Sequence, residues 1–161
     1  MATPPCCSRR GFTLVELVVT VAIVGVLATV TLPLAQLTVQ RQKEQELRVA
    51  LRQIREAIDA YKRAADEGRV ARRADESGYP RTLQTLVAGV EDAKQLDRRK
   101  IYFLRRLPRD PFADAAADPA QTWGKRSYAS PPETPSEGTD VYDVYSLAAG
   151  TGLNGIPYRS W

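Results

Sequence analysis

The distribution of hydrophobic and charged positions changes near Gln40. Between Leu17 and Gln40 the chain has no charged side chain, whereas beyond Gln40 charged residues are frequent. A helix that crosses the hydrocarbon core of a membrane needs roughly 20 mainly apolar residues. An isolated segment in lipid has to be helical, because a helix satisfies its own backbone hydrogen bonds. We therefore predict that residues 12–40 form a transmembrane helix.

Beyond Gln40 the apolar residues recur at steps of three and four, which is the spacing of one helix face. The stripe consists of Leu47, Leu51, Ile54, Ile58, Tyr61 and Ala65. Opposite charges at helical spacing, such as Glu44 with Arg48, support a helix. Gly68 is the first stop signal after it. We predict that residues 41–67 continue the same helix and carry a small domain, with a coiled coil as the alternative.

Residues 68–161 show the shorter patterns of a small folded domain. Thr82 precedes apolar residues at helical spacing and is a typical N-cap for a short helix. Residues 126–129 and 140–147 have the composition of strands, and the proline-containing 130–138 segment links them. The predicted fold class is α+β, with a long N-terminal α-helix packed on a small C-terminal antiparallel β-sheet domain.

The last part of the chain is rich in glycine and aromatic residues. Three glycines fall within residues 150–155. A phosphate-binding loop is an alternative interpretation, but the lysine and hydroxyl of such loops are absent and no helix follows. We therefore predict a structural turn. Trp123 and Trp161 are predicted to be packing anchors, and an exposed assembly contact is the alternative for Trp161.

The composition excludes several classes of site. There is no histidine, which excludes His-based triads and His-containing zinc sites. Cys6 and Cys7 are adjacent and have no later partner, so an intrachain disulfide framework is excluded. The formal net charge is +4, but the charges after Gln40 are interleaved in sign, as on a solvated helix face. We therefore predict no nucleic-acid partner.

Arg9 and Arg10 lie directly before the apolar segment. They favour a cytoplasmic N-terminus by the positive-inside rule, although Arg41 and Lys43 weaken the charge asymmetry. In an ordinary secretory signal a small-residue cleavage site follows the apolar core. Here the small residue, Gly11, comes before it, so cleavage after Gly11 would leave the helix on the mature protein.

Glu16 is the only ionisable side chain from Phe12 through Gln40. A carboxylate near a membrane segment is costly and is therefore a functional candidate. The alternative is that it is solvated at the level of the lipid headgroups. Cleavage after Gly11 would create a free amine on Phe12. In low-dielectric packing the amine of a neighbouring copy could become the partner that the carboxylate needs.

The string Gly11-Phe12-Thr13-Leu14-Val15-Glu16, after Arg9-Arg10 and before an apolar run, resembles the class III signal of type IV pilins and type II secretion pseudopilins. The resemblance implies that a prepilin peptidase removes residues 1–11 as a leader and methylates the new N-terminal Phe12. It also implies that Glu16 supports subunit docking. Pro33 falls where the family often has a proline that loosens the helix. No residue is predicted to be catalytic.

Later segments resemble, in their order, the major (G-type) pseudopilin of the type II secretion system. They are Gly78-Tyr79-Pro80, Leu107-Pro108-Arg109-Asp110-Pro111-Phe112, Trp123-Gly124 and Tyr142-Asp143-Val144-Tyr145-Ser146. The resemblance implies a calcium ion in the loop near the C-terminus. Calcium prefers oxygen ligands that usually include carboxylates, but no Asp or Glu follows Asp143. We therefore predict no metal site and no cofactor.

The resemblance implies a structural subunit of a periplasmic pseudopilus that drives protein export, and no enzymatic activity. The implied partners are copies of itself and other pseudopilins in a helical filament, a prepilin peptidase, an inner-membrane assembly platform and, before assembly, inner-membrane lipid. The implied location is the bacterial inner membrane, single-pass, with residues 68–161 in the periplasm. A type IV pilin for adhesion, motility or DNA uptake is the alternative within the family. A membrane-tethered periplasmic enzyme, resting on carboxylates such as Asp140 and Asp143, is the alternative of another class.

Overall fold

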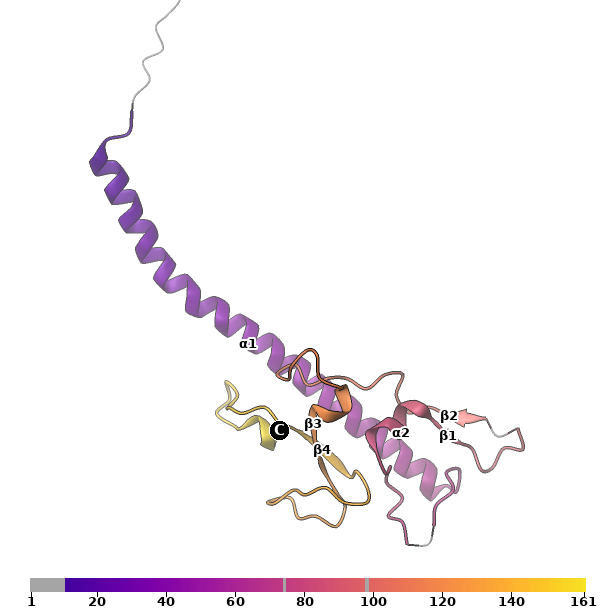
Figure 1. Cartoon of the computed structure of the whole chain (residues 1–161). Coiled ribbons are helices and arrows are strands. Elements are labelled where there is room, and N and C mark those ends of the chain that lie inside the picture. Colours follow the sequence, from indigo (N-terminus) through magenta and orange to yellow (C-terminus); the bar gives the residue numbers. More distant parts are fainter. Residues whose placement is uncertain (1–10, 74, 98) are drawn as a thin grey trace, which may run out of the picture. The chain divides into compact units, whose positions relative to one another are not determined.

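The structure, a computed structural model, describes residues 11–73, 75–97 and 99–161, without the side chains of residues 29–35. Except for Gly11, the predicted leader of residues 1–11 lies outside the described residues, and so do Cys6, Cys7, Arg9 and Arg10. The chain divides into two compact units between Gln40 and Arg41. Helix α1 (Leu14–Asp66) contributes residues to both units (Figure 1).

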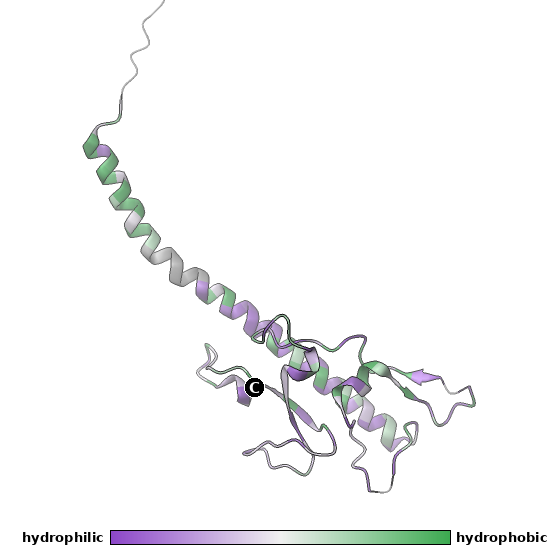
Figure 2. Ribbon diagram, viewed as in Figure 1, coloured by the Kyte–Doolittle hydropathy of each residue, from purple (hydrophilic) through white to green (hydrophobic). Residues whose placement is uncertain are grey.

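The N-terminal part of α1 forms the first unit. The helix begins at Leu14 because Thr13 caps it. The Oγ1 atom of Thr13 accepts a hydrogen bond from the amide of Glu16 at 3.3 Å, and its carbonyl accepts one from the amide of Leu17 at 3.1 Å. All side chains of residues 11–28 are exposed, and the hydropathy colours of the ribbon in Figure 2 show that most of the residues at the start of α1 are hydrophobic.

Two predictions about this unit remain predictions. Among the described residues, no helix combines the length and the apolar character needed to cross a membrane. The predicted span of residues 12–40 includes residues 29–35, whose side chains lie outside the described part of the chain. Pro33 is one of them. The backbone at position 33 is helical, and the predicted loosening of the helix there stays a prediction.

The second unit is built on the apolar stripe of α1, as predicted. Leu47, Leu51, Ile54, Ile58 and Ala65 are all at most 3% exposed. The residues that pack on this stripe are Leu83 and Leu86 of α2 (Leu83–Ala88), together with Trp123, Val141, Val144 and Tyr158. Full burial of one large aliphatic side chain contributes roughly 1.5–3 kcal/mol. The stripe therefore supplies much of the core that holds the small domain on the helix.

The β-structure consists of two antiparallel pairs. Strand β1 (Val90–Glu91) pairs with β2 (Lys100–Ile101), and β3 (Trp123–Arg126) pairs with β4 (Asp143–Ser146). Short 3₁₀ helices, η1 (Pro119–Gln121) and η2 (Tyr158–Ser160), complete the unit. The predicted fold class is confirmed, because a long N-terminal helix packs with a small antiparallel β-domain in a pilin-like α+β arrangement.

Both predicted strands differ from the structure in their boundaries. The pattern predicts a strand over residues 126–129, but β3 ends at Arg126. The chain turns there because the Asp140 carboxylate accepts hydrogen bonds from the Ser127 hydroxyl at 2.6 Å and the Tyr128 amide at 2.9 Å. The second strand, predicted over residues 140–147, is confined to β4. Its first residues leave the ladder because the amide of Val141 donates to the carbonyl of Pro80 at 2.8 Å.

Candidate functional site

The predicted processing residues, Gly11 and Phe12, lie just before α1. Both are exposed and outside any regular element, and Phe12 is 83% exposed. No atom lies within 4 Å of the position that a Cβ would take on Gly11. The peptide bond between the two residues is therefore accessible, as proteolytic sites usually are. Cleavage of this bond and methylation of the new amine on Phe12 stay predictions.

Glu16 lies in the first turn of α1. Its backbone amide donates to the Thr13 hydroxyl, which is one half of the capping box that a Thr-x-x-Glu sequence favours. The negative charge also suits the positive end of the helix dipole. Its carboxylate is exposed and has no hydrogen bond or ion pair with any residue that the structure describes. The backbone of Glu16 thus has a local role, and its carboxylate is left available to another molecule.

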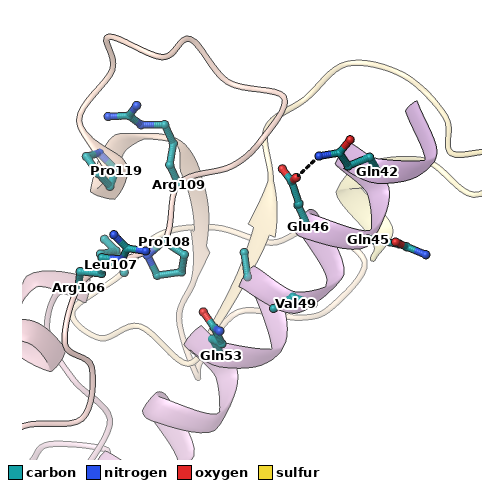
Figure 3. A pocket seen from close by; sticks show the side chains of 11 residues that line it. Gln42, Gln45, Glu46, Val49, Gln53, Arg106, Leu107, Pro108, Arg109 and Pro119 are labelled. Atoms are coloured by element: carbon teal, nitrogen blue, oxygen red, sulfur yellow. Dashed lines mark hydrogen bonds between the residues drawn. The ribbon is translucent and has the colours of Figure 1, made fainter. Parts of the chain in front are cut away.

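A groove of about 760 Å³ lies beside α1 in the second unit (Figure 3). It is lined by Gln42, Gln45, Glu46, Val49, Ala50 and Gln53 on the helix, and by residues 106–109 and Pro119 opposite. Its only carboxylate, on Glu46, accepts a hydrogen bond from Gln42 Nε2 at 3.0 Å. The lining residues include no Ser, Thr, Cys or Tyr. A catalytic site needs a positioned acid–base pair or nucleophile, and the residues that line this groove supply no nucleophile.

Asp140 and Asp143 are the carboxylates on which the alternative of a membrane-tethered enzyme rests, and both have structural partners. Burial raises the pKa of Asp140, but hydrogen bonds from Ser127, Ser77 and the Tyr128 amide outweigh this effect, so that its pKa lies below the ordinary value. Asp143 accepts a hydrogen bond from Arg55 Nε at 2.8 Å. A carboxylate whose pKa is lowered, as that of Asp140 is, is a poor proton acceptor near neutral pH.

Residues 147–161, here called the 147–161 loop, fold against the second part of α1. The amide of Gly152 donates to the carbonyl of Ile156 at 2.9 Å, which closes the turn predicted for residues 150–155. Beneath the loop lies Glu44 of α1, which is 5% exposed. Its Oε1 atom accepts hydrogen bonds from the amide of Leu153 at 2.9 Å and from the hydroxyl of Tyr158 at 3.0 Å. The loop is therefore attached to the helix through a buried carboxylate.

Two arginines of α1 attach the end of the same loop. Arg55 Nη2 donates to the main-chain oxygen of Trp161 at 2.8 Å and to the carbonyl of Val144 at 3.1 Å. The guanidinium of Arg48 lies 4.5 Å from the centroid of the Trp161 ring, within the range of a cation–π contact. Trp161 is thus a packing anchor, as predicted, and it is also a hydrogen-bond acceptor for the helix.

The residues around the loop do not fit the calcium ion that the resemblance implies. Calcium takes about six to eight oxygen ligands, usually with several carboxylates. The loop itself contains no Asp or Glu. The buried carboxylate of Asp110 accepts from the amide of Phe112 at 2.8 Å and from the hydroxyl of Ser146. Within the described part of the chain, no group of three or more Cys, Asp or Glu residues is placed to hold a metal.

Glu44 is the residue whose position differs most from the sequence-based expectation. Its spacing with Arg48 predicts a solvated charge pair, but the side chain is buried. A signal was present, because Glu44 precedes Leu47 by three residues and Leu51 by seven. Those steps place it on the apolar stripe of the helix. A carboxylate on such a stripe requires hydrogen-bond donors from the domain that covers it.

Comparison with known proteins adds to this picture. Residues 6–32 match the family described as the prokaryotic N-terminal methylation motif. The type II secretion system core protein G of Klebsiella michiganensis is 30% identical over 109 residues, which cover 65% of this chain and 69% of that protein. Its namesake in Klebsiella pneumoniae is 32% identical over 108 residues, with the same coverage. The Pseudomonas aeruginosa protein of this name is 29% identical over 145 residues, covering 88% of this chain and 84% of its own. No solved structure matches.

These relatives and the fold lead to one family. The methylation motif includes Gly11 and Phe12, just before α1, and Glu16 in its first turn. The similarity to the two Klebsiella proteins reaches 30% and 32% identity over 69% of each relative. The chain therefore belongs to the family of type II secretion system core protein G, the major pseudopilins.

Proposed function

We propose that this protein is a structural subunit of a pseudopilus, the periplasmic filament that drives protein export in a type II secretion system. The curated relatives carry the name of that system's core protein G. The observation that carries the proposal is the exposed apolar surface at the start of α1. Phe12, Leu14, Val15 and Leu17 are between 61% and 83% exposed. A helix that is apolar all round needs lipid or other helices around it.

In this proposal the chain has four parts with different tasks. Residues 1–11 are a leader that the prepilin peptidase removes. Residues 12–40 are a single membrane span with a cytoplasmic N-terminus, and later the core of the filament. Residues 41–67 continue the helix and carry the periplasmic domain of residues 68–161. An inner-membrane assembly platform transfers the subunit from lipid to a filament of its own copies and other pseudopilins, which is an open, heterologous assembly.

Glu16 is proposed to act when the subunit passes from the lipid membrane into the filament. Cleavage after Gly11 gives Phe12 a free amine, which the peptidase then methylates. The Glu16 carboxylate has no partner within the described residues of its own chain, and an unpaired carboxylate is unfavourable among packed apolar helices. Pairing with the amine of a neighbouring subunit removes this cost. Pro33 is proposed to loosen the helix, since proline removes one backbone hydrogen bond.

The test separates the charge of Glu16 from its part in capping the helix. Glu16→Gln keeps the capping-box geometry and removes the charge, whereas Thr13→Ala removes the cap and keeps the charge. Cells that contain the remaining secretion components would be sheared, and the filaments quantified. We expect Glu16→Gln to lower the filament yield by at least about tenfold, as for the loss of a buried ion pair. Thr13→Ala should stay near the wild-type yield.

The mass of the mature N-terminus, measured on the same samples, makes the test decisive. We expect both variants to begin with N-methylated Phe12, so that the filament defect of Glu16→Gln arises after processing. Normal filaments from Glu16→Gln would refute the docking role. An equal defect in Thr13→Ala would assign the effect to helix capping. An intact Met1 on the wild-type protein would overturn the proposed processing and, with it, the filament function.

A further inference from the structure

The backbone hydrogen bonds within the 147–161 loop are all short in range. They form the turn over residues 152–156, the bridge between Thr151 and Pro157 with its bond from the amide of Tyr158 to the carbonyl of Gly150, and the single turn of η2. Loops of this kind open readily unless side chains from a rigid element hold them. In this protein the rigid element is α1, whose residues Glu44, Arg48 and Arg55 all contact the loop.

Glu44 is the central contact of this attachment. A carboxylate that is 5% exposed is strongly unfavourable unless donors satisfy it. The loop supplies two such donors, the amide of Leu153 and the hydroxyl of Tyr158. Tyr158 is itself 4% exposed and stacks on Phe112, with 4.4 Å between the ring centroids. Glu44 and the loop therefore stabilise each other, and charge-assisted hydrogen bonds are stronger than neutral ones.

The chemistry around Glu44 suits an anion and opposes a cation. Its Oε1 atom accepts hydrogen bonds from an N–H and an O–H group, so a cation bound to this atom would lie against their hydrogens. Arg48 and Arg55 add two positive charges along the loop, and both contact Trp161. Asp143, the last carboxylate before the loop, is paired with Arg55 and with Arg126. A divalent cation placed here would meet repulsion and few free oxygens.

We infer that this pseudopilin fixes its 147–161 loop with the Glu44 carboxylate in place of a bound calcium ion, so that the loop is ordered without metal. The inference concerns the folded subunit and does not depend on the proposed filament function. It marks a departure from what the family resemblance implies. In this chain a helix side chain beneath the loop does the work that metal ligands within the loop would otherwise do.

The test measures hydrogen exchange of the loop amides, above all that of Leu153, in the full chain purified in detergent. We expect the wild-type protein to exchange at the same rate with excess chelator as with millimolar calcium chloride, and to melt at the same temperature. Ligand binding to the folded state would raise the melting temperature. Slower exchange or a higher Tm in calcium would overturn the inference.

Variants then test the role of Glu44 itself. Glu44→Ala should speed the exchange of the loop amides by about tenfold or more, because two hydrogen bonds to a charged group are lost. Calcium should not restore the slow exchange. The matched control is Glu46→Ala, which removes an exposed carboxylate from the same helix and should leave the loop unchanged. Unchanged exchange in Glu44→Ala would also refute the inference.

If Glu44→Ala does not fold, Tyr158→Phe tests the same inference. This variant removes one donor to Glu44 and retains the aromatic ring that stacks on Phe112. It should fold, and it should speed exchange at Leu153 by a smaller factor than Glu44→Ala. An exchange rate equal to that of the wild-type protein would show that Glu44 does not hold the loop. Because all these measurements use the unassembled subunit, their failure would leave the filament proposal intact.

Discussion

Gly124 illustrates how a single position can fix the packing of the short sheet. It pairs with Tyr145 across β3 and β4, and a Cβ at this position would overlap the ring of Tyr145. The neighbouring Trp123 is 1% exposed, and its Nε1 atom donates to the carbonyl of Pro108 at 2.9 Å. The predicted anchor role of Trp123 is therefore confirmed. The absence of a side chain at Gly124 leaves room for the Tyr145 ring.

We expect Gly124→Ala to destabilise the fold by about 1–3 kcal/mol, the usual cost of forcing extra volume into a packed site. Thermal unfolding followed by circular dichroism would show a lower Tm. Lys125→Ala is the matched control, because its side chain pairs with the exposed Glu137. Such surface pairs contribute at most about 1 kcal/mol. Equal effects of the two substitutions would contradict the packing explanation.

At the scale of residues, the sequence predicts positions whose role is local better than positions whose role depends on the fold. Gly11, Phe12 and Glu16 stand in one contiguous string, so their pattern could be recognised directly. Glu44 could not be assigned in this way, because its donors lie more than a hundred positions further along the chain, at Leu153 and Tyr158. Only the tertiary structure brings these three residues together.

Helices and strands were also predicted better where their bounds depend on nearby residues than where they depend on distant contacts. The end of α1 was predictable because its signals are local: an apolar stripe with helical spacing and then Gly68. In the structure the amide of Gly68 donates to the carbonyl of Ala65 at 3.0 Å, and that of Arg69 to Ala64 at 2.9 Å. This is a Schellman motif. Strands β3 and β4 were displaced from their predicted bounds because contacts distant in sequence, such as that of Val141 with Pro80, decide where they start and stop.

The prediction for the elements concerns Gly68, at the C-terminal end of α1. Its φ angle is +72°, in the left-handed region, and the nearest atom to an added Cβ would be 3.9 Å away. Any effect of Gly68→Ala should therefore come from backbone conformation. We expect a loss of about 1–2 kcal/mol in the free energy of unfolding. Gly68→Asn should lose less, because asparagine tolerates this conformation. Thermal unfolding of both variants checks the order, and equal losses would contradict it.

At the scale of the whole molecule, the two units differ in how they are stabilised. The described side chains of residues 11–28 are all exposed, so this part of α1 depends on surroundings that the isolated chain does not supply. The second unit has its own core and several carboxylates held by donors. We therefore expect the unfolding of the isolated subunit to report on the second unit, and its pH dependence to follow those carboxylates.

Asp140 and Asp92 determine the sign of that dependence. Burial raises the pKa of each, but hydrogen bonds outweigh it, from Ser127 and Ser77 for Asp140 and from Arg69 for Asp92, so both pKa values are lowered. A carboxyl whose pKa is lower in the folded state stabilises the protein fully above its unfolded pKa, which is about 3.9. This stabilisation is lost as the pH falls through the folded pKa. The subunit should therefore lose stability below about pH 4.

The contribution of Asp140 can be isolated with Asp140→Asn. At neutral pH this variant should be less stable by about 1–3 kcal/mol, because the new amide group faces the donors that served the carboxylate. Its Tm should also fall less steeply than that of the wild-type protein below about pH 4, since one ionisable group no longer contributes. Glu133→Gln, which alters an exposed carboxylate, should keep the wild-type profile. An acid profile of Asp140→Asn as steep as that of the wild-type protein would assign the acid sensitivity to other groups.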